Sequence, residues 1–171
     1  MPNHVHLILI PDNKDGLRAT LAETHRRYTG RINARNKWTG HLWQGRFGSV
    51  AMDEDHLASA VRYVSLNPVR ARLVSRAEYW EWSSVRAHLA GVSDGVVEVA
   101  VVLDRFPDFA AMLSAGEDDA MINKIRKAET TGRPAGNAGW LQDMERLTGR
   151  ALAPKKRGPK PRLRVISKLS P

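Results

Sequence analysis

The first ten residues set the strongest limit on the fold. Residues 5–10 read VHLILI, a short β-prone run that a Pro-Asp-Asn sequence ends at residues 11–13. This pattern is typical of a buried strand followed by a turn. Residues 47–52 are a second strand candidate, and residues 96–103 fit a strand or a helix equally well. The sequence therefore predicts an α+β fold with a small sheet.

The remaining apolar pattern is helical. Residues 16–36 repeat apolar side chains at helical spacing and leave most arginines off that stripe, which predicts an amphipathic helix with a basic side. Asp53 is a suitable N-cap for a helix that we expect to end near residue 66, because Asn67 and Pro68 interrupt the pattern. Further helices are expected over residues 69–75, up to residue 90, and over residues 118–130 and 139–147.

The charge distribution indicates a polyanionic partner. Lys and Arg number 27 against 18 Asp and Glu, a net charge of +9. Residues 17–50 hold seven cations and one acid, residues 150–171 hold eight cations and no acid, and residues 94–119 hold seven acids and one cation. A basic front and a basic tail predict binding to nucleic acid. For the proline-interrupted tail, residues 154–171, the alternative is a solvated, disordered end without a binding role.

Composition excludes several classes of protein. The 171 residues include no cysteine, which excludes disulfides, thiolate metal sites and cysteine nucleophiles. No run of 18 apolar residues is present, so the sequence predicts no membrane span. The apolar run at residues 5–10 is too short and too polar for a secretory signal. We therefore expect a cytoplasmic protein with no membrane partner.

Two histidines at the chain start are candidate metal ligands. His4 and His6 are two residues apart, and on a strand such positions point to the same face. Two neutral imidazoles side by side can hold one divalent ion. The alternative is a partly buried pair with a structural role only.

Tyr63 and Asn67 form a second candidate element. Tyr63 flanks the apolar stripe of its predicted helix, in line with His56 and with Asn67 one turn later. A tyrosine on that flank is not simply a core residue. The alternative is a boundary tyrosine whose hydroxyl reaches water.

Four motifs, in the same order, resemble those of the single-tyrosine HUH transposases, and most closely the REP-associated tyrosine transposases. They are MPNHVHL at residues 1–7, HLWQGRF at 41–47, YVSLNPVRA at 63–71 and WSS at 82–84. The resemblance implies an HUH-type antiparallel sheet covered by helices over residues 1–90, a helical extension over 91–153 and a basic DNA-binding arm over 154–171. Members of the family carry a strand and a helix before the first motif, so we expect a domain truncated at its N-terminus.

The resemblance also implies a chemistry. His4, His6 and Asn67 would hold a divalent ion, Mg²⁺ or Mn²⁺, that offsets the charge of a phosphodiester. Tyr63 would attack the phosphorus, because a phenolate is both a nucleophile and a leaving group. Such enzymes cut and rejoin single-stranded or hairpin DNA, in many cases palindromic REP elements, through a 5′-phosphotyrosine link. The implied protein is a nucleoid-associated monomer or homodimer that acts in DNA transposition and recombination.

Cations and aromatic residues complete the predicted DNA surface. Trp38 or Trp43 could stack on unpaired bases, whereas the pattern favours the core for Trp80 and Trp82. Two alternatives remain open: a DNA-binding relative without catalysis, and a metal-dependent nuclease that activates water at the His pair and forms no adduct. The predicted DNA-binding residues are Arg26, Arg27, Arg31, Arg35, Lys37, Arg46, Arg70, Arg72, Lys155, Lys156, Arg157 and Lys160.

Overall fold

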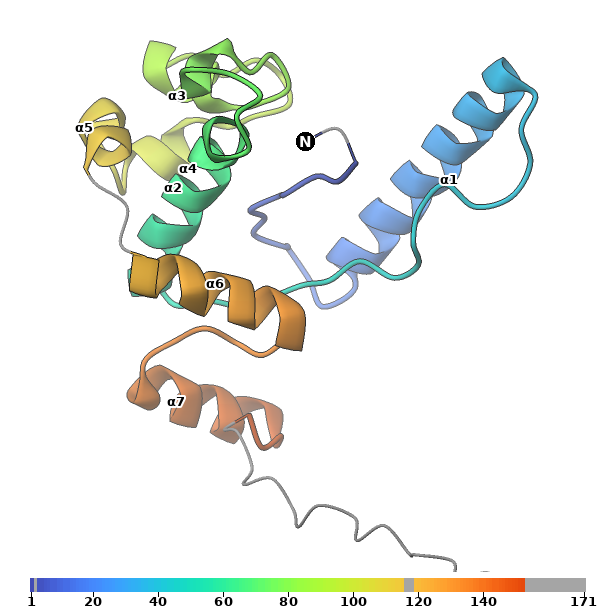
Figure 1. Cartoon of the computed structure of the whole chain (residues 1–171). Coiled ribbons are helices and arrows are strands. Elements are labelled where there is room, and N and C mark those ends of the chain that lie inside the picture. The colour runs from blue at the N-terminus through green and yellow to red at the C-terminus, as the bar shows by residue number, and fades with distance from the viewer. Residues whose placement is uncertain (2, 116–118, 153–171) are drawn as a thin grey trace, which may run out of the picture. The chain divides into compact units, whose positions relative to one another are not determined.

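The computed structural model describes residues 1, 3–115 and 119–152 (Figure 1). The chain divides into two compact units, residues 1–136 and 137–171. The predicted DNA-binding cations of the arm, Lys155, Lys156, Arg157 and Lys160, lie outside the described residues. The first unit contains α1 (Gly16–Asn36), α2 (Glu54–Arg70), η1 (Ala77–Tyr79), α3 (Val85–Ala90), α4 (Ala100–Leu103), α5 (Phe109–Ser114) and α6 (Asp119–Thr131), and the second contains α7 (Ala138–Thr148).

The prediction of an α+β fold with an HUH-type antiparallel sheet is wrong. Among the described residues the β-structure is limited to one isolated parallel bridge, between Met52 and Ala135. Residues 5–10 form no backbone hydrogen bond to any other segment that the structure describes, and Val5, Leu7 and Ile10 are 57–70% exposed. Strand propensity describes only how well a residue fits a pleated surface, so an apolar run without a partner does not make a sheet. The second expected strand, at residues 47–52, contributes only the bridge residue.

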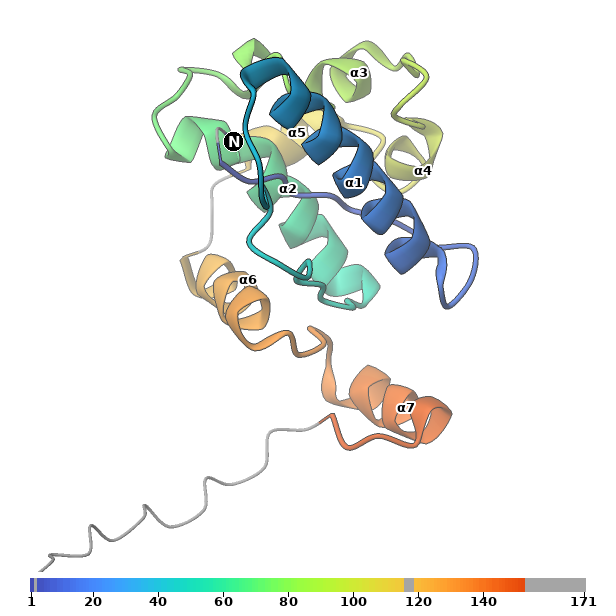
Figure 2. The ribbon, with the colours of Figure 1, turned by 90° about the vertical axis from the view of Figure 1, so that its right-hand side faces the viewer.

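The core of the first unit contains residues that precede residue 90 and residues that follow it. Val61 of α2, Ala77 of η1, Val85 of α3 and Phe109 of α5 form a buried cluster, with Val85 fully buried. Figure 1 shows these elements grouped together, and Figure 2 shows the same group turned by 90°. The compact units accordingly divide after residue 136, whereas the motif pattern had placed a boundary near residue 90.

Helix α2 carries the candidate nucleophile. The prediction that Asp53 caps it is confirmed, because Asp53 Oδ1 accepts a hydrogen bond from the His56 backbone N–H at 3.0 Å. The predicted end near residue 66 is wrong, since the helix continues through the buried Pro68 to Arg70. A proline inside a helix lacks its own N–H donor and crowds the carbonyl four residues earlier, but it leaves its own carbonyl free to accept. The Pro68 carbonyl still accepts from Leu73 N–H at 2.9 Å, so the last turn closes.

Helix α1 has the predicted bounds, but none of its residues is buried. After α1 the chain turns at Lys37 and runs back beside the helix as a return loop, residues 37–50 (Figure 1). This loop, instead of a sheet, covers part of the apolar stripe. The helix therefore keeps most of its side chains in contact with solvent.

The remaining helices largely match the sequence pattern. The expected helix near residue 90 ends at Gly91, which adopts the left-handed conformation (φ 67°). The helix expected over 69–75 does not form, and the ambiguous residues 96–103 contain the short helix α4. α6 and α7 begin and end within one residue of their expected bounds. No helix within the described ranges combines the length and the apolar character that crossing a membrane requires.

Candidate functional site

The structure brings His4, His6 and Tyr63 together. The ring centroids of His6 and Tyr63 are 5.9 Å apart with an interplanar angle of 80°, and those of His4 and His6 are 4.9 Å apart at 87°. Tyr63 is 7% exposed and sits on α2, while the histidines belong to the extended N-terminal segment. Two motifs far apart in the sequence therefore form one cluster.

Arg70 joins this cluster from the last turn of α2. Its guanidinium carbon lies 4.4 Å from the centroid of the Tyr63 ring, a cation–π contact. Its Nη2 also donates a hydrogen bond of 2.7 Å to the Tyr63 carbonyl oxygen. Residues seven apart in a helix lie on one face, two turns from each other. The predicted phosphate-contact residue Arg70 is thus placed at the candidate nucleophile.

Glu129 of α6 is a member of the cluster that the sequence reasoning missed. Its Oε1 lies 3.4 Å from Nδ1 of His6, close enough for an ion pair when the imidazole is protonated. The glutamate is on an element with no recognisable motif, 66 residues after Tyr63 in the chain. No spacing in the sequence signals this approach, because it depends on how α6 packs against α2.

The environment of His6 favours the neutral imidazole. Burial lowers the pKa of His6 below its ordinary value of 6.5, and the charges of His4, the N-terminus and Arg70 act in the same direction. The carboxylate of Glu129 opposes this shift of the His6 pKa. The free electron pair of a neutral imidazole can bind a metal ion or accept a proton.

The structure places two of the three predicted metal ligands side by side. The rings of His4 and His6 are in edge-to-face contact, and Asn67 lies on α2 one turn after Tyr63. Across the described residues, no three His, Asp or Glu side chains are grouped to hold a metal ion. Imidazole nitrogens and an amide oxygen are donors that Mn²⁺ accepts, so a divalent ion at His4, His6 and Asn67 stays a prediction.

His56, which lies in line with Tyr63 on α2, contacts the residue that caps the helix. Its Nδ1 lies 2.6 Å from Oδ1 of Asp53, which also caps α2. Asp53 is 8% exposed, and its own N–H donates to the Ala135 carbonyl at 3.1 Å. This pair fixes the start of α2 against the chain that follows α6.

The predicted DNA-binding arginines fall into two groups. Arg26 and Arg27 both bind Glu23, with N–O distances of 2.7 and 2.6 Å, and these hydrogen bonds lower the pKa of Glu23 to about 2. The other predicted DNA-binding cations of α1 and its return loop are exposed and form no ion pair among the described residues. They are Arg31, Arg35, Lys37 and Arg46, and Arg72 is likewise exposed just beyond α2.

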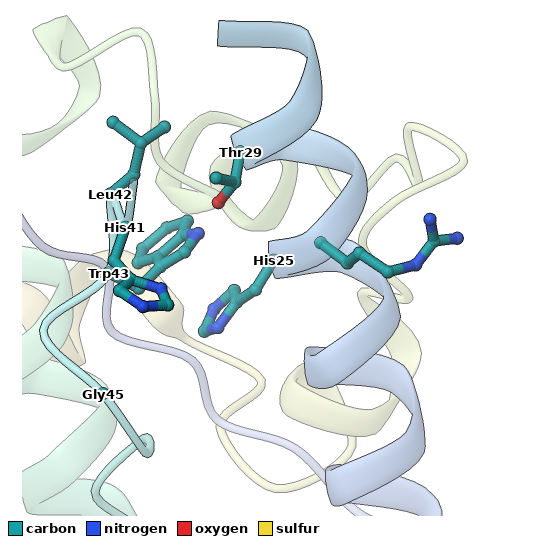
Figure 3. A pocket seen from close by; sticks show the side chains of 7 residues that line it. His25, Thr29, His41, Leu42, Trp43 and Gly45 are labelled. Carbon is teal, nitrogen blue, oxygen red and sulfur yellow. The ribbon is translucent and has the colours of Figure 1, made fainter. Parts of the chain in front are cut away.

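A pocket of about 230 Å³ lies between α1 and the return loop. Figure 3 shows His25 and Thr29 reaching from the helix toward His41 and Trp43 of the loop. The rings of His25 and Trp43 are stacked, with centroids 4.0 Å apart and an interplanar angle of 14°. Trp43 therefore anchors the loop on α1, and His25 occupies one face of its indole.

The tryptophans otherwise divide by exposure. Trp38 is 59% exposed, which leaves it available for stacking. The core position favoured for Trp82 is wrong, because its side chain is 78% exposed, while Trp80 is half-buried. The buried Ala77 and Val85 on either side of Trp82 supply the core contacts of this segment instead.

Comparison with known proteins adds nothing to this geometry: no protein-family model, curated protein or solved structure matches the chain.

Proposed function

We propose that this protein cuts and rejoins single-stranded DNA through a covalent bond between Tyr63 and a 5′-phosphate. The observation that carries the proposal is the cluster in which His6 and Arg70 contact the Tyr63 ring and His4 contacts His6. A structural tyrosine needs neither two histidines from a distant segment nor a guanidinium on its ring. The motif resemblance supports the same chemistry, although the fold that it implies does not form.

The chemistry needs a nucleophile, a proton acceptor and positive charge. The Tyr63 hydroxyl would give its proton to a neutral imidazole such as that of His6, and its oxygen would attack phosphorus. The bond from phosphorus to the 3′ oxygen would break, and that oxygen would take up the proton to become a 3′ hydroxyl. Arg70, whose guanidinium lies on the Tyr63 ring, would offset the negative charge of the phosphate. Because the phosphotyrosine retains the phosphodiester bond energy, the reverse reaction rejoins strands without ATP.

The basic surface of α1 supports DNA as the substrate. Phosphate contacts by Lys and Arg supply most of the affinity for nucleic acid, and they do so without sequence preference. Hairpin DNA from repetitive palindromes follows from the resemblance alone. A divalent ion at His4, His6 and Asn67, either Mg²⁺ or Mn²⁺, likewise stays a prediction of the sequence.

A second candidate function is DNA binding without catalysis. The observation that favours it is the burial of Tyr63, which leaves only 7% of the residue exposed. A catalytic tyrosine has to reach a phosphorus atom, which a buried side chain can do only after the surrounding structure moves. DNA binding without catalysis requires no such movement of Tyr63.

The covalent adduct separates the two candidates. The full chain is incubated with a labelled hairpin oligonucleotide that carries single-stranded flanks, with Mg²⁺ or Mn²⁺, and resolved by denaturing electrophoresis. Tyr63→Phe removes only the hydroxyl and should eliminate both the cleavage and the shifted protein–DNA band. The matched controls are Tyr28→Phe and Tyr79→Phe, since the chain has three tyrosines and these two are 51% and 57% exposed. An adduct that survives Tyr63→Phe, or no adduct from the wild type, contradicts the proposal.

A further inference from the structure

We propose that the C-terminal end of α1 is a stacking site for single-stranded DNA, with Trp38 as the platform for a base and Arg31, Arg35 and Lys37 as contacts to the flanking phosphates. This inference rests on the proposed function for the identity of the polyanion. It assigns a defined binding site on an element separate from the Tyr63 cluster.

The backbone around Trp38 is fixed. Lys37 adopts the left-handed conformation (φ 55°), and the Trp38 N–H donates to the Asn33 carbonyl at 2.9 Å. The Asn33 side chain in turn donates to the Gly40 carbonyl at 3.0 Å. An indole that is 59% exposed is thus presented from a closed turn. A ring held in this way loses little further conformational freedom when a base stacks on it.

Trp43, the other tryptophan of this region, does not present an equivalent surface. His25 stacks on one face of its indole, and the Tyr28 ring lies 5.7 Å away at 52°. Its Nε1 is buried without a hydrogen-bond partner. Trp38 therefore remains as the base platform of this region.

The charges beside Trp38 complement a nucleic acid backbone. Residues 24–52 contain six cations and no acid. Arg31 and Arg35 are four residues apart and share one face of α1. Trp38 follows three residues after Arg35, just beyond the left-handed Lys37 that ends the helix. An aromatic ring bordered by cations is the arrangement that binds successive nucleotides of a single strand.

The test uses fluorescence anisotropy of a labelled thymidine 20-mer with the full chain. Stacking of one base on an aromatic side chain accounts for roughly 5- to 150-fold in affinity. We expect Trp38→Ala to weaken binding within that range and Trp38→Phe to retain most of it. The matched control is Trp82→Ala, which removes an even more exposed indole from a different segment. Equal binding by Trp38→Ala and the wild type would overturn the proposal, as would an equal loss in Trp82→Ala.

An abasic 20-mer distinguishes stacking from charge. It keeps every phosphate and has no base, so Trp38→Ala should not weaken its binding further. A loss as large as with thymidine would mean that the variant disturbs the phosphate contacts, which overturns the platform role. For the cations, replacing Arg31, Arg35 and Lys37 with Gln should reduce the slope of log K against log salt by about 2, since each contact to a single strand contributes roughly 0.7.

Two further outcomes keep this proposal separate from the proposed function. If Trp38→Ala weakens binding but no variant or wild-type protein ever forms an adduct, the stacking site stands and the strand-cleavage function falls. If polyglutamate displaces the oligonucleotide as efficiently as unlabelled DNA does, the site prefers acidic polypeptide and the stacking proposal is overturned.

Discussion

Arg70 and Tyr63 contact each other twice: the guanidinium carbon lies 4.4 Å from the centroid of the phenol ring, and Nη2 donates a 2.7 Å hydrogen bond to the tyrosine carbonyl. In the second contact, the Tyr63 carbonyl accepts a hydrogen bond from a side chain two turns further along the same helix. Pro68 lies between them, and the carbonyl that would pair with its missing N–H belongs to Val64 and not to Tyr63. Arg70 thus ties the last turn of α2 to the turn before the proline and places its charge on the ring of the candidate nucleophile.

Replacing Arg70 should therefore affect both stability and chemistry. Arg70→Met removes a cation–π contact and a charge-assisted hydrogen bond, and we expect it to lower the free energy of unfolding by about 1–2 kcal/mol, measured by urea titration. It should also reduce adduct formation at least tenfold, whereas Arg70→Lys, which keeps the charge, should lose less. Arg133→Met is the control, because Arg133 is exposed and is not among the predicted DNA-binding residues. An Arg70→Met variant that behaves like this control would show that neither contact matters.

A second prediction concerns pH and the buried His88. This imidazole is 7% exposed, its ring centroid lies 4.9 Å from that of Phe109, and its Nδ1 has no hydrogen-bond partner among the residues that the structure describes. Burial lowers the pKa of His88 below the ordinary 6.5, and Asp94 only partly opposes this. The unfolded chain therefore takes up a proton at a higher pH than the folded chain. Stability should fall as the pH drops below about 6.5 and level off below the folded-state pKa.

Urea titrations at several pH values between 7.5 and 5 measure this loss. His88→Leu keeps an apolar side chain against Phe109 and should flatten the pH dependence relative to the wild type. His6 has a lowered pKa as well, so part of the slope should remain and should disappear in the variant that replaces both histidines. An unchanged slope in His88→Leu would show that another group controls the acid sensitivity.

The sequence predicts local features of this fold better than its tertiary contacts. The bounds of α1, the cap at Asp53 and the left-handed Gly91 follow from short-range rules, because each depends on neighbours within one or two turns. The sheet was predicted incorrectly because a strand requires a partner, and the propensity of residues 5–10 contains no information about one. The approach of Glu129 to His6 escapes the same rules, since it depends on packing between segments more than 100 residues apart.

The candidate site divides in the same way. The two-residue spacing of His4 and His6 predicts that both side chains lie on one face of an extended chain, and their rings are in contact. Asn67 is assigned to the site by a helical turn and by resemblance, and the helix that puts it one turn after Tyr63 does form. Residue spacing within one helix or extended segment thus predicts which side chains share a face. Contacts between elements depend on tertiary packing, which no sequence motif indicates.

The basic arm should contribute affinity and not sequence choice. Deleting everything after Pro154 removes seven cations, Lys155 to Lys168, that alternate with prolines and have no helical or strand pattern. Each cation that contacts a phosphate of single-stranded DNA contributes about 0.7 to the slope of log K against log salt, so the truncated protein should show a smaller slope. Affinity should fall by a similar factor for unrelated sequences. A truncation that changes the rank order of sequences would show that the arm contacts bases.

The last prediction tests the metal at the histidine pair. A divalent ion offsets the charge of the phosphodiester, so replacing His4 or His6 with Ala should abolish Mg²⁺- or Mn²⁺-dependent cleavage. Binding to the hairpin should be largely unchanged, because phosphate contacts elsewhere supply most of the affinity. Titration calorimetry with Mn²⁺ gives a readout independent of activity and should show a site in the wild type that either variant lacks. His41→Ala is the control, since His41 is an exposed imidazole that lines the pocket beside α1. Mn²⁺ binding that persists in the double variant would assign the ion to another part of the chain, and cleavage that persists in it would leave Tyr63 working without these two ligands.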